Sequence, residues 1–147
     1  MLHYNRFWSE QTMRLRLPAC SLVKNRRIDS VVVINDFNGM GMSTFNKASF
    51  DMIRSVTKQG SDYCPETLKV SYIINAPMAF TAIYAIVKNF LEEDTRKKMV
   101  ILGSDYEATL LKTIDSSQLP VFLGGSCTCK EMGGDCMRSD KGPWQDF

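Results

Sequence analysis

The sequence predicts an α/β domain built on a mainly parallel sheet with crossover helices. Three segments have the apolar, β-branched character of strands, at 27–36, 68–75 and 99–102. A stretch with apolar residues at helical spacing follows each of them. This β-α-β-α-β-α order with short connections is typical of parallel strands joined by helices. At 147 residues the chain is long enough for one such domain with a buried core.

The region before the second strand should contain two helices and the clearest strand. Residues 4–17 are expected to form a helix that ends near Pro18, since proline disrupts a helix interior. The four consecutive β-branched residues Val31–Ile34 indicate a strand buried on both faces. A helix at 44–59 should follow, capped by Ser43 or Thr44 and ended by Gly60. Its apolar stripe consists of Phe45, Ala48, Met52, Ile53 and Val56, and Phe50 falls outside it.

Residues 70–87 carry no formal charge and are the only candidate for a membrane span. Asn75-Ala76-Pro77 interrupts this stretch, and the spacing changes there from strand-like to helical. We therefore expect a strand at 68–75, a helix at 78–91 and no span. The opening residues lack the apolar core of a signal peptide. Together with five cysteines, an odd number, this favours a soluble protein in a reducing, cytosolic environment.

Composition and motifs give little support to an enzyme or a nucleic-acid-binding protein. The chain has 18 basic and 16 acidic residues, for a net charge of +2, and no dense basic tract. The only histidine, His3, lies near the terminus, so a catalytic triad has no candidate. Cys20 and Arg26 match the C-x5-R spacing of cysteine phosphatases, but no glycine lies between them. Gly39-Met-Gly41 lacks the third glycine of a dinucleotide-binding motif. We expect no enzyme activity and no cofactor.

Three cysteines stand out in the C-terminal part of the chain. A short helix at 106–114 and an extended piece at 119–123 should lead into an irregular tail at 124–147. Cys127, Cys129 and Cys136 in this tail resemble a three-thiolate metal set. A structural zinc site normally has four ligands, and only Cys20 or Cys64, folding back, could complete one. We therefore expect free thiols and no metal site.

The helix at 78–91 has a broad apolar arc. At about 100° per residue this arc contains Phe80, Ile83, Tyr84, Ile86, Val87, Phe90 and Leu91. The opposite side carries Thr81, Ala82, Ala85, Lys88 and Asn89 and is only weakly polar. The acidic residues Glu92-Glu93-Asp94 should form a solvated turn after it. A helix packed on a core would have this pattern, and so would one that faces an apolar cavity on one side and a membrane surface on the other.

An ordered series of short strings runs through nearly the whole chain, from about residue 10 to 145. It includes Leu17-Pro-Ala-Cys-Ser21, Ile28-Asp-Ser30, Ile34-Asn-Asp36, Cys64-Pro-Glu-Thr-Leu68, Tyr72-Ile-Ile-Asn-Ala-Pro77, Asp94-Thr95, Val100-Ile-Leu-Gly103, Leu119-Pro120, Phe122-Leu-Gly-Gly125 and Gly142-Pro-Trp144. Together these strings resemble the CRAL-TRIO lipid-binding domain, in its branch of phosphatidylinositol/phosphatidylcholine transfer proteins.

The resemblance implies a sheet floor and a gating helix that enclose a pocket for one phospholipid, foremost phosphatidylinositol, which the protein transfers or presents between membranes. The family's headgroup-binding positions fall on Glu66, Thr95 and Lys98. Lys98 offers an ammonium to the phosphate, while Glu66 and Thr95 can hydrogen-bond inositol hydroxyls. Alternatively, Lys98 is one of three cations, Arg96–Lys98, on a solvated turn. The expected acyl-chain pocket consists of Val31, Val33, Phe80, Ile83, Tyr84, Val87, Phe90 and Ile101.

The resemblance also implies a cytoplasmic monomer that contacts membranes transiently, of Golgi or endosomal type, and takes part in vesicle trafficking without a nucleic-acid partner. The hydroxyl residues that contact phosphatidylcholine in this branch fall here on Val31 and Val33, whose side chains cannot hydrogen-bond. This either weakens the binding of phosphatidylcholine, the second expected ligand, or shifts the pocket toward a more apolar one. The N-terminal helical lobe and first strand of the family are not matched, so we expect residues 1–147 to form a single, partial lipid-binding domain. If this shortened lobe does not close a pocket, it would act as a membrane- or protein-interaction module without lipid exchange.

Overall fold

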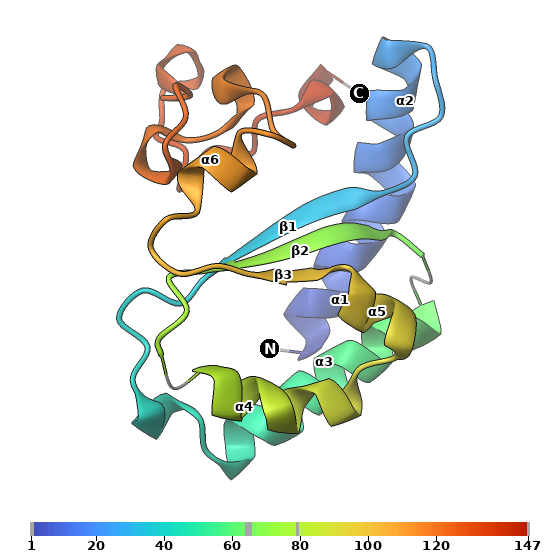
Figure 1. Ribbon diagram of the computed structural model, residues 1–147. Helices are drawn as coiled ribbons and strands as arrows, with labels where there is room; N and C mark the ends of the chain where they lie inside the picture. Colours follow the sequence, from blue (N-terminus) through green and yellow to red (C-terminus); the bar gives the residue numbers. More distant parts are fainter. Residues whose placement is uncertain (1, 64–65, 79, 147) are drawn as a thin grey trace.

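The computed structural model describes residues 2–63, 66–78 and 80–146, and a parallel sheet lies at its centre (Figure 1). Its strands are β1 (Val31–Asp36), β2 (Leu68–Ile74) and β3 (Met99–Ile101), hydrogen-bonded in the order β1-β2-β3. Both strand pairs are parallel. The predicted α/β fold with a mainly parallel sheet is therefore confirmed.

The strand register decides which side chains share a face of the sheet. Paired residues of parallel strands point to the same side, and successive residues along a strand alternate. Two rows on one face are Val33, Ser71 and Met99, and then Asn35, Ile73 and Ile101. We call this the α4 face, because α4 (Phe80–Val87), the helix that follows β2, packs against it. The opposite face carries Val32, Ile34, Tyr72, Ile74 and Val100.

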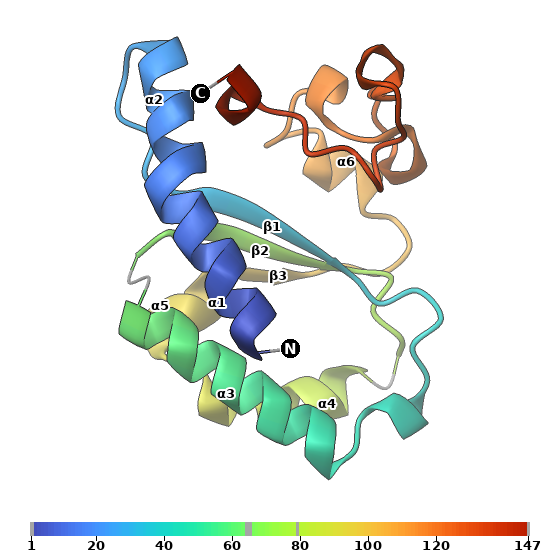
Figure 2. The ribbon, with the colours of Figure 1, turned by 180° about the vertical axis from the view of Figure 1, so that it is seen from behind.

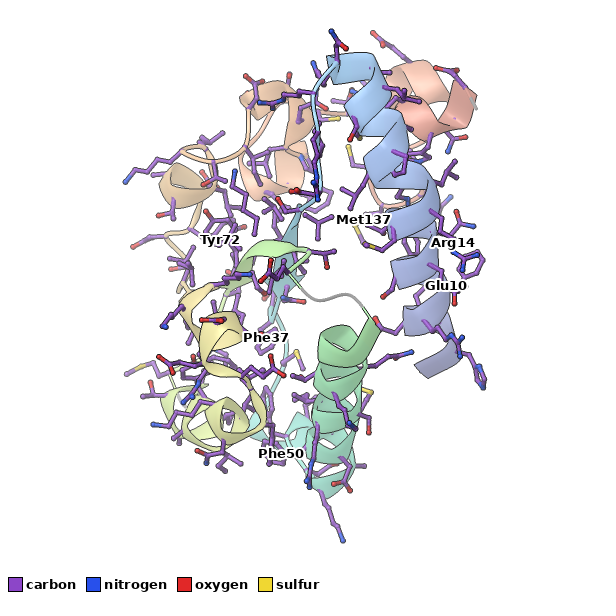
Figure 3. All side chains as sticks on the ribbon, turned by 90° about the vertical axis from the view of Figure 1, so that its right-hand side faces the viewer. Glu10, Arg14, Phe37, Phe50, Tyr72 and Met137 are labelled. Atoms are coloured by element: carbon purple, nitrogen blue, oxygen red, sulfur yellow. The ribbon has the colours of Figure 1, made fainter. Side chains whose placement is uncertain are left out.

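Helices α3 (Lys47–Tyr63) and α4 (Phe80–Val87) lie below the sheet, against the α4 face (Figures 1 and 2). The buried centre of this layer consists of Ile73, Phe80, Ile83 and Val87. Phe37 and Phe50, labelled in Figure 3, pack around that centre from the β1 loop and from α3. Within the described residues no helix has both the length and the apolarity to cross a membrane.

The C-terminal segment covers the opposite face of the sheet. The buried side chains of this second layer are Tyr72, Ile74, Leu110, Leu119 and Leu123. The expected helix at 106–114 is shorter, because α6 spans only Glu107–Leu110. The extended piece predicted at 119–123 is confined to Leu119 and Pro120, and Pro120 forms a β-bridge with Cys127. The prediction was wrong for Val121–Leu123, a 3-10 turn that ends at Gly124 with a left-handed φ of 88°. Further 3-10 turns lie at Ser116–Gln118, Lys130–Met132 and Pro143–Asp146.

A single helical rod runs past the β1 edge of the sheet (Figures 2 and 3). It consists of α1 (Leu2–Gln11), a π-helical turn (Thr12–Arg16) and α2 (Leu17–Lys24). The prediction that a helix ends near Pro18 was wrong. The wider π turn precedes Pro18, which then occupies the first turn of α2, where its missing N–H costs little. The rod ends at Asn25, in a left-handed conformation.

Local capping explains the shifted start of α3. The amide of Asn46 donates to the Ser49 Oγ at 2.9 Å, and the amide of Ser49 donates to the Asn46 Oδ1 at 3.2 Å. This reciprocal capping box starts the helix at Lys47, so the expected caps Ser43 and Thr44 were wrong. The helix also continues through Gly60, since one glycine costs only about 1 kcal/mol. Phe50 is consequently half-buried, whereas Ala48 and Met52 of the predicted stripe are exposed.

The connection from α4 to β3 is helical rather than an acidic turn. A 3-10 turn (Lys88–Phe90) extends α4, and α5 spans Glu93–Lys97. Glu93 and Asp94 lie in the first turn of α5, where the helix dipole favours negative charge. The solvated turn predicted at Glu92-Glu93-Asp94 was therefore wrong for the last two residues.

Candidate functional site

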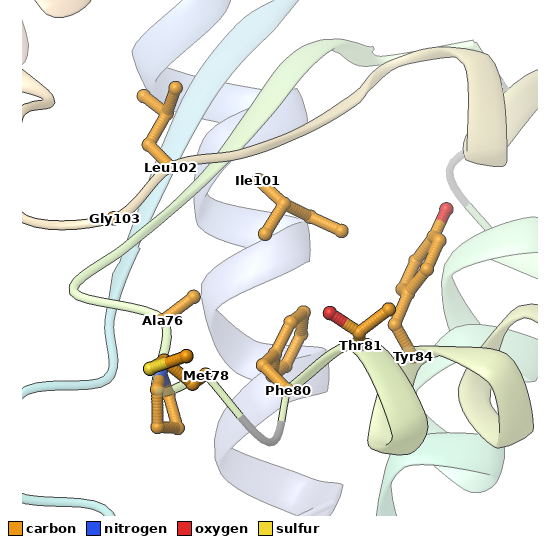
Figure 4. Close-up of a pocket in the computed structure, with 9 residues that line it drawn as sticks. Ala76, Met78, Phe80, Thr81, Tyr84, Ile101, Leu102 and Gly103 are labelled. Atoms are coloured by element: carbon orange, nitrogen blue, oxygen red, sulfur yellow. The ribbon is translucent and has the colours of Figure 1, made fainter.

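A pocket of about 380 Å³ lies between α4 and the end of β3 (Figure 4). Its walls are Ala76, Pro77, Met78, Phe80, Thr81, Tyr84, Ile101, Leu102 and Gly103. In Figure 4 the side chains of Phe80, Thr81 and Tyr84 point from α4 toward Ile101 of β3. The pocket thus follows the exposed edge of the sheet at its carboxyl end, where open parallel sheets commonly bind ligands.

Apolar packing holds α4 in place beside this pocket. The ring of Phe80 meets that of Phe37 edge to face, with centroids 5.2 Å apart, and lies nearly parallel to that of Tyr84, with centroids 6.2 Å apart. Ile83 and Val87 are buried one and two turns further along. The other side of α4 is open to solvent, and Ile86 is 48% exposed there. The helix therefore presents apolar surface in both directions.

The structure brings together only part of the expected acyl-chain set. Phe80, Tyr84 and Ile101 line the pocket, whereas Ile83 and Val87 are buried in the core beneath the sheet. The remaining members, Val31, Val33 and Phe90, are not among the lining residues. Val33 is 36% exposed on the α4 face. Phe90 is half-buried in the turn after α4, with the Arg54 guanidinium 5.8 Å from its ring centroid.

The sequence analysis did not identify two polar residues on this side of the sheet, Ser71 on β2 and Thr81 on α4. Ser71, only 8% exposed, accepts a hydrogen bond of 3.1 Å from the Asn35 Nδ2. The alternation along a strand indicates on which face each side chain lies. Whether Asn35 lies close enough to Ser71 to form a hydrogen bond also depends on the register between β1 and β2. Thr81 lines the pocket although the helical projection placed it on the outer side. The start of α4 at Phe80 brings the first turn of the helix to the pocket mouth.

The three expected headgroup residues all lie at the amino-terminal end of the sheet. Glu66 precedes β2 and is exposed, with a left-handed φ of 64°. Thr95 lies on α5, and Lys98 connects α5 to β3; both side chains are half-buried. The Lys98 amide donates to the Thr95 carbonyl at 3.1 Å, and the Lys98 carbonyl accepts from the Ser71 amide at 2.8 Å. Backbone hydrogen bonds thus fix Thr95 and Lys98 relative to the strands.

Lys98 differs from the neighbouring lysine in its electrostatic partners. The Nζ of Lys97 lies 2.9 Å from a carboxylate oxygen of Glu93 and 3.6 Å from one of Asp94. Within the part of the chain that the structure describes, the side chain of Lys98 forms no ion pair or hydrogen bond. Its ammonium is therefore available to an anionic ligand.

The three C-terminal cysteines also converge. Cys129 is buried, and Cys127 and Cys136 are half-buried. A hydrogen bond with the Ser139 side chain, aided by the neighbouring thiols and by the positive charge of Lys141, holds the pKa of Cys129 below its ordinary value. Burial, followed by the neighbouring sulfur atoms, raises the pKa of Cys136 to about 12. Cys64, the fifth cysteine, lies outside the described residues.

Comparisons with known proteins identify the family of this chain. A family model described as the CRAL/TRIO domain matches residues 2–125. The phosphatidylinositol/phosphatidylcholine transfer protein SFH12 of Arabidopsis thaliana is 45% identical over 145 residues, which are 99% of this chain and 26% of that protein. SFH4 of the same plant, with the same description, is 47% identical over 93% of this chain and 22% of its own length. The crystal structure of Sfh5 is 28% identical, with a TM-score of 0.49 over 53% of this chain and 28% of that one.

A parallel α/β sheet with an apolar helix over one face and an apolar pocket at its edge defines a domain suited to an apolar ligand. The chain belongs to the CRAL/TRIO domain family. It spans about a quarter of the length of the Arabidopsis relatives that it matches.

Proposed function

We propose that this chain binds a phospholipid, with phosphatidylinositol as the favoured ligand, and transfers or presents it between membranes. The observation that carries the proposal is the match, over 93–99% of the chain, to relatives described as phosphatidylinositol/phosphatidylcholine transfer proteins. The apolar pocket beside α4 and the ammonium of Lys98, which no described residue pairs, give that activity a physical basis.

In the proposed complex the phospholipid lies along β3. Lys98 immediately precedes this strand, and Ile101–Gly103 line the pocket at its far end. Five residues of extended chain separate Lys98 from Gly103, or about 16 Å. Lys98 binds the phosphate at the amino-terminal end, Thr95 and Glu66 bind inositol hydroxyls, and an acyl chain enters the pocket between Phe80 and Ile101.

The proposed exchange takes place on a membrane surface, with α4 as the contacting element. Ala82, Ala85 and Ile86 on its outer side are exposed and cost little to bury in lipid. Lys88, also exposed, can extend its ammonium to lipid phosphates. The protein would then act as a cytoplasmic monomer that associates with membranes only transiently.

Native mass spectrometry after expression in a eukaryotic host tests the proposal. We expect one phosphatidylinositol per chain to co-purify, and the protein to move labelled phosphatidylinositol from donor to acceptor vesicles. Transfer of phosphatidylcholine should be weaker. Folded protein that carries no lipid and transfers neither phospholipid would contradict the proposal.

A second candidate function is an interaction module without lipid exchange. The buried cluster that Phe80, Ile83 and Val87 form with Ile73 favours it, because this packing occupies the space beneath the centre of the sheet. The remaining volume of about 380 Å³ is near the lower end of the range for ligand pockets, about 300–1,000 Å³. Vesicle binding by lipid-free protein, with no transfer, would favour this function over the first.

A further inference from the structure

The thiols of Cys127, Cys129 and Cys136 meet at one point in the C-terminal segment. The Sγ atoms lie 3.5 Å apart for Cys127 and Cys129, 3.7 Å for Cys127 and Cys136, and 3.3 Å for Cys129 and Cys136. Two thiolates on one tetrahedral Zn²⁺ are about 3.8 Å apart, since each Zn–S bond is about 2.3 Å. The three sulfur atoms therefore already have nearly the spacing of ligands around a single ion.

Backbone contacts fix this arrangement. The Cys127 amide donates to the Leu119 carbonyl at 2.9 Å, and the Cys127 carbonyl accepts from the Val121 amide at 3.1 Å. The chain reverses at Cys129, which has a left-handed φ of 52°, and at Gly133, which has a φ of 69°. These turns bring Cys136 back over Cys127. The cluster is thus tied to the 119–123 turn, whose Leu119 and Leu123 cover the sheet opposite the lipid pocket.

The charge around the cluster suits three thiolates and a divalent cation. Such a complex would carry a net charge of −1. The Lys141 Nζ lies 3.9 Å from the Cys127 Sγ and can offset that charge. No carboxylate, histidine or further thiol in the described residues joins the three sulfur atoms within 4.8 Å.

We propose that Cys127, Cys129 and Cys136 bind one Zn²⁺ ion as thiolates, with the fourth coordination position open to solvent or to an external ligand. Thiolates are soft ligands and select Zn²⁺ or Cu(I) over the hard cations Mg²⁺ and Ca²⁺. Three protein ligands with an open position are typical of zinc sites that exchange a ligand, whereas closed structural sites have four. The expectation of free thiols came from counting ligands by spacing, and the convergence of all three sulfur atoms argues against it.

Zinc titration of the full chain, reduced and stripped of metal, tests the site. In competition with a chromophoric chelator we expect one equivalent of Zn²⁺ to bind. Co²⁺ in its place should give the near-ultraviolet absorption of thiolate-to-metal charge transfer. Cys127→Ser and Cys136→Ser should each lower the affinity by about 100-fold or more, beyond the 10–100-fold that loss of an outer partner costs. Lys141→Ala should lower it by about 10-fold.

Cys20→Ser is the matched control, because Cys20 is a half-buried thiol on α2, outside the cluster. Its affinity for Zn²⁺ should equal that of the unmodified chain. A measurement that needs no variant is alkylation with peptide mapping: Zn²⁺ should protect Cys127, Cys129 and Cys136 but not Cys20. This readout still decides the matter if a serine variant does not fold.

Four outcomes would overturn the site. They are no stoichiometric Zn²⁺ binding by the reduced chain, unchanged affinity in folded Cys127→Ser and Cys136→Ser, a disulfide among the three cysteines in freshly purified protein, and binding of Cu(I) with exclusion of Zn²⁺. Lipid transfer is measured separately, since the cluster and the pocket lie on opposite faces of the sheet. Failure of one proposal is therefore distinguishable from failure of the other.

Discussion

Lys98 and Lys97 are adjacent in the sequence but differ in their environments. Lys97 is paired with Glu93 and Asp94 on α5, while Lys98 is half-buried and forms no such pair in the described part of the chain. Three consecutive cations, Arg96–Lys98, predict a basic turn but not which of them is free. The distinction depends on where α5 begins, because Glu93 reaches Lys97 one helical turn later.

Replacement of Lys98 by alanine tests the headgroup assignment. Loss of a charge-assisted hydrogen bond to phosphate should reduce phosphatidylinositol transfer by about 1.5–3 kcal/mol, or roughly 10- to 150-fold. Glu66→Ala should also reduce it, since an acceptor for inositol hydroxyls is lost. Vesicle transfer assays measure both effects. Melting temperatures should barely change, as neither side chain supports the core.

Lys97→Ala is the matched control for this prediction, because it removes a neighbouring charge that α5 already pairs. Its transfer rate should remain close to that of the unmodified chain. Equal losses in Lys97→Ala and Lys98→Ala would indicate a general electrostatic effect. Unaltered transfer in a Lys98→Ala, Glu66→Ala double variant would remove the headgroup assignment.

At the scale of elements, strands were predicted better than helix boundaries. The run Val31–Ile34 predicts a strand, and β1 lies there. The expected burial on both faces was wrong, because β1 is an edge strand of the described sheet and its residues are half-buried or exposed. Helix ends depend on single side chains instead: the capping pair Asn46 and Ser49 moved the start of α3. The π turn before Pro18 depends on how the rod packs beside the sheet, and hydrophobic periodicity carries no signal for it.

Helix α4 provides the prediction at this scale. Ala85 is exposed on its outer side, so Ala85→Glu should leave the core intact while placing a carboxylate against the bilayer. One unfavourable charge near an anionic surface costs about 1 kcal/mol, or about fivefold in exchange rate. We expect exchange between anionic vesicles to fall by about that factor, with little change in melting temperature.

Ala108→Glu is a suitable control, because Ala108 is exposed on α6, which belongs to the layer on the opposite face of the sheet. Exchange by this variant should be normal. Unchanged exchange in Ala85→Glu would mean that α4 is ordinary core packing and that the membrane-contacting element lies elsewhere.

At the scale of the whole molecule, the sequence predicts that both faces of the sheet are covered, but not how the covering elements pack. The consecutive apolar residues Tyr72, Ile73 and Ile74 of β2 indicate two covered faces, yet the sequence cannot say that α4 fills the space below Ile73. The pocket joins residues from separate parts of the chain, whereas the cysteine cluster is local in sequence and depends on how residues 127–136 turn. Ile101 meets Phe80 because of the crossover from β2, and Cys136 meets Cys127 because of two left-handed turns.

A contact between the two ends of the chain completes this architecture. The Arg16 side chain, on the rod, is 15% exposed, and its Nη2 lies 3.2 Å from each carboxylate oxygen of Asp140. Its guanidinium also lies 3.8 Å from the ring centroid of Trp8 and 5.4 Å from that of Trp144. One arginine therefore joins the rod to the end of the C-terminal segment.

Arg16→Ala should release that segment from the rod. Loss of the cation–π contact and of the partly buried ion pair should destabilise the protein by about 2 kcal/mol, measured by denaturant unfolding. Limited proteolysis should then cut residues 128–146 faster than in the unmodified chain. Arg16→Lys should recover only part of the loss, because an ammonium cannot stack as a planar guanidinium does.

Arg14→Ala is the matched control, because it removes an exposed charge from the same π turn, and it should have little effect. Equal stability and proteolysis in Arg16→Ala and Arg14→Ala would mean that the apolar contacts of α2 alone hold the C-terminal segment in place.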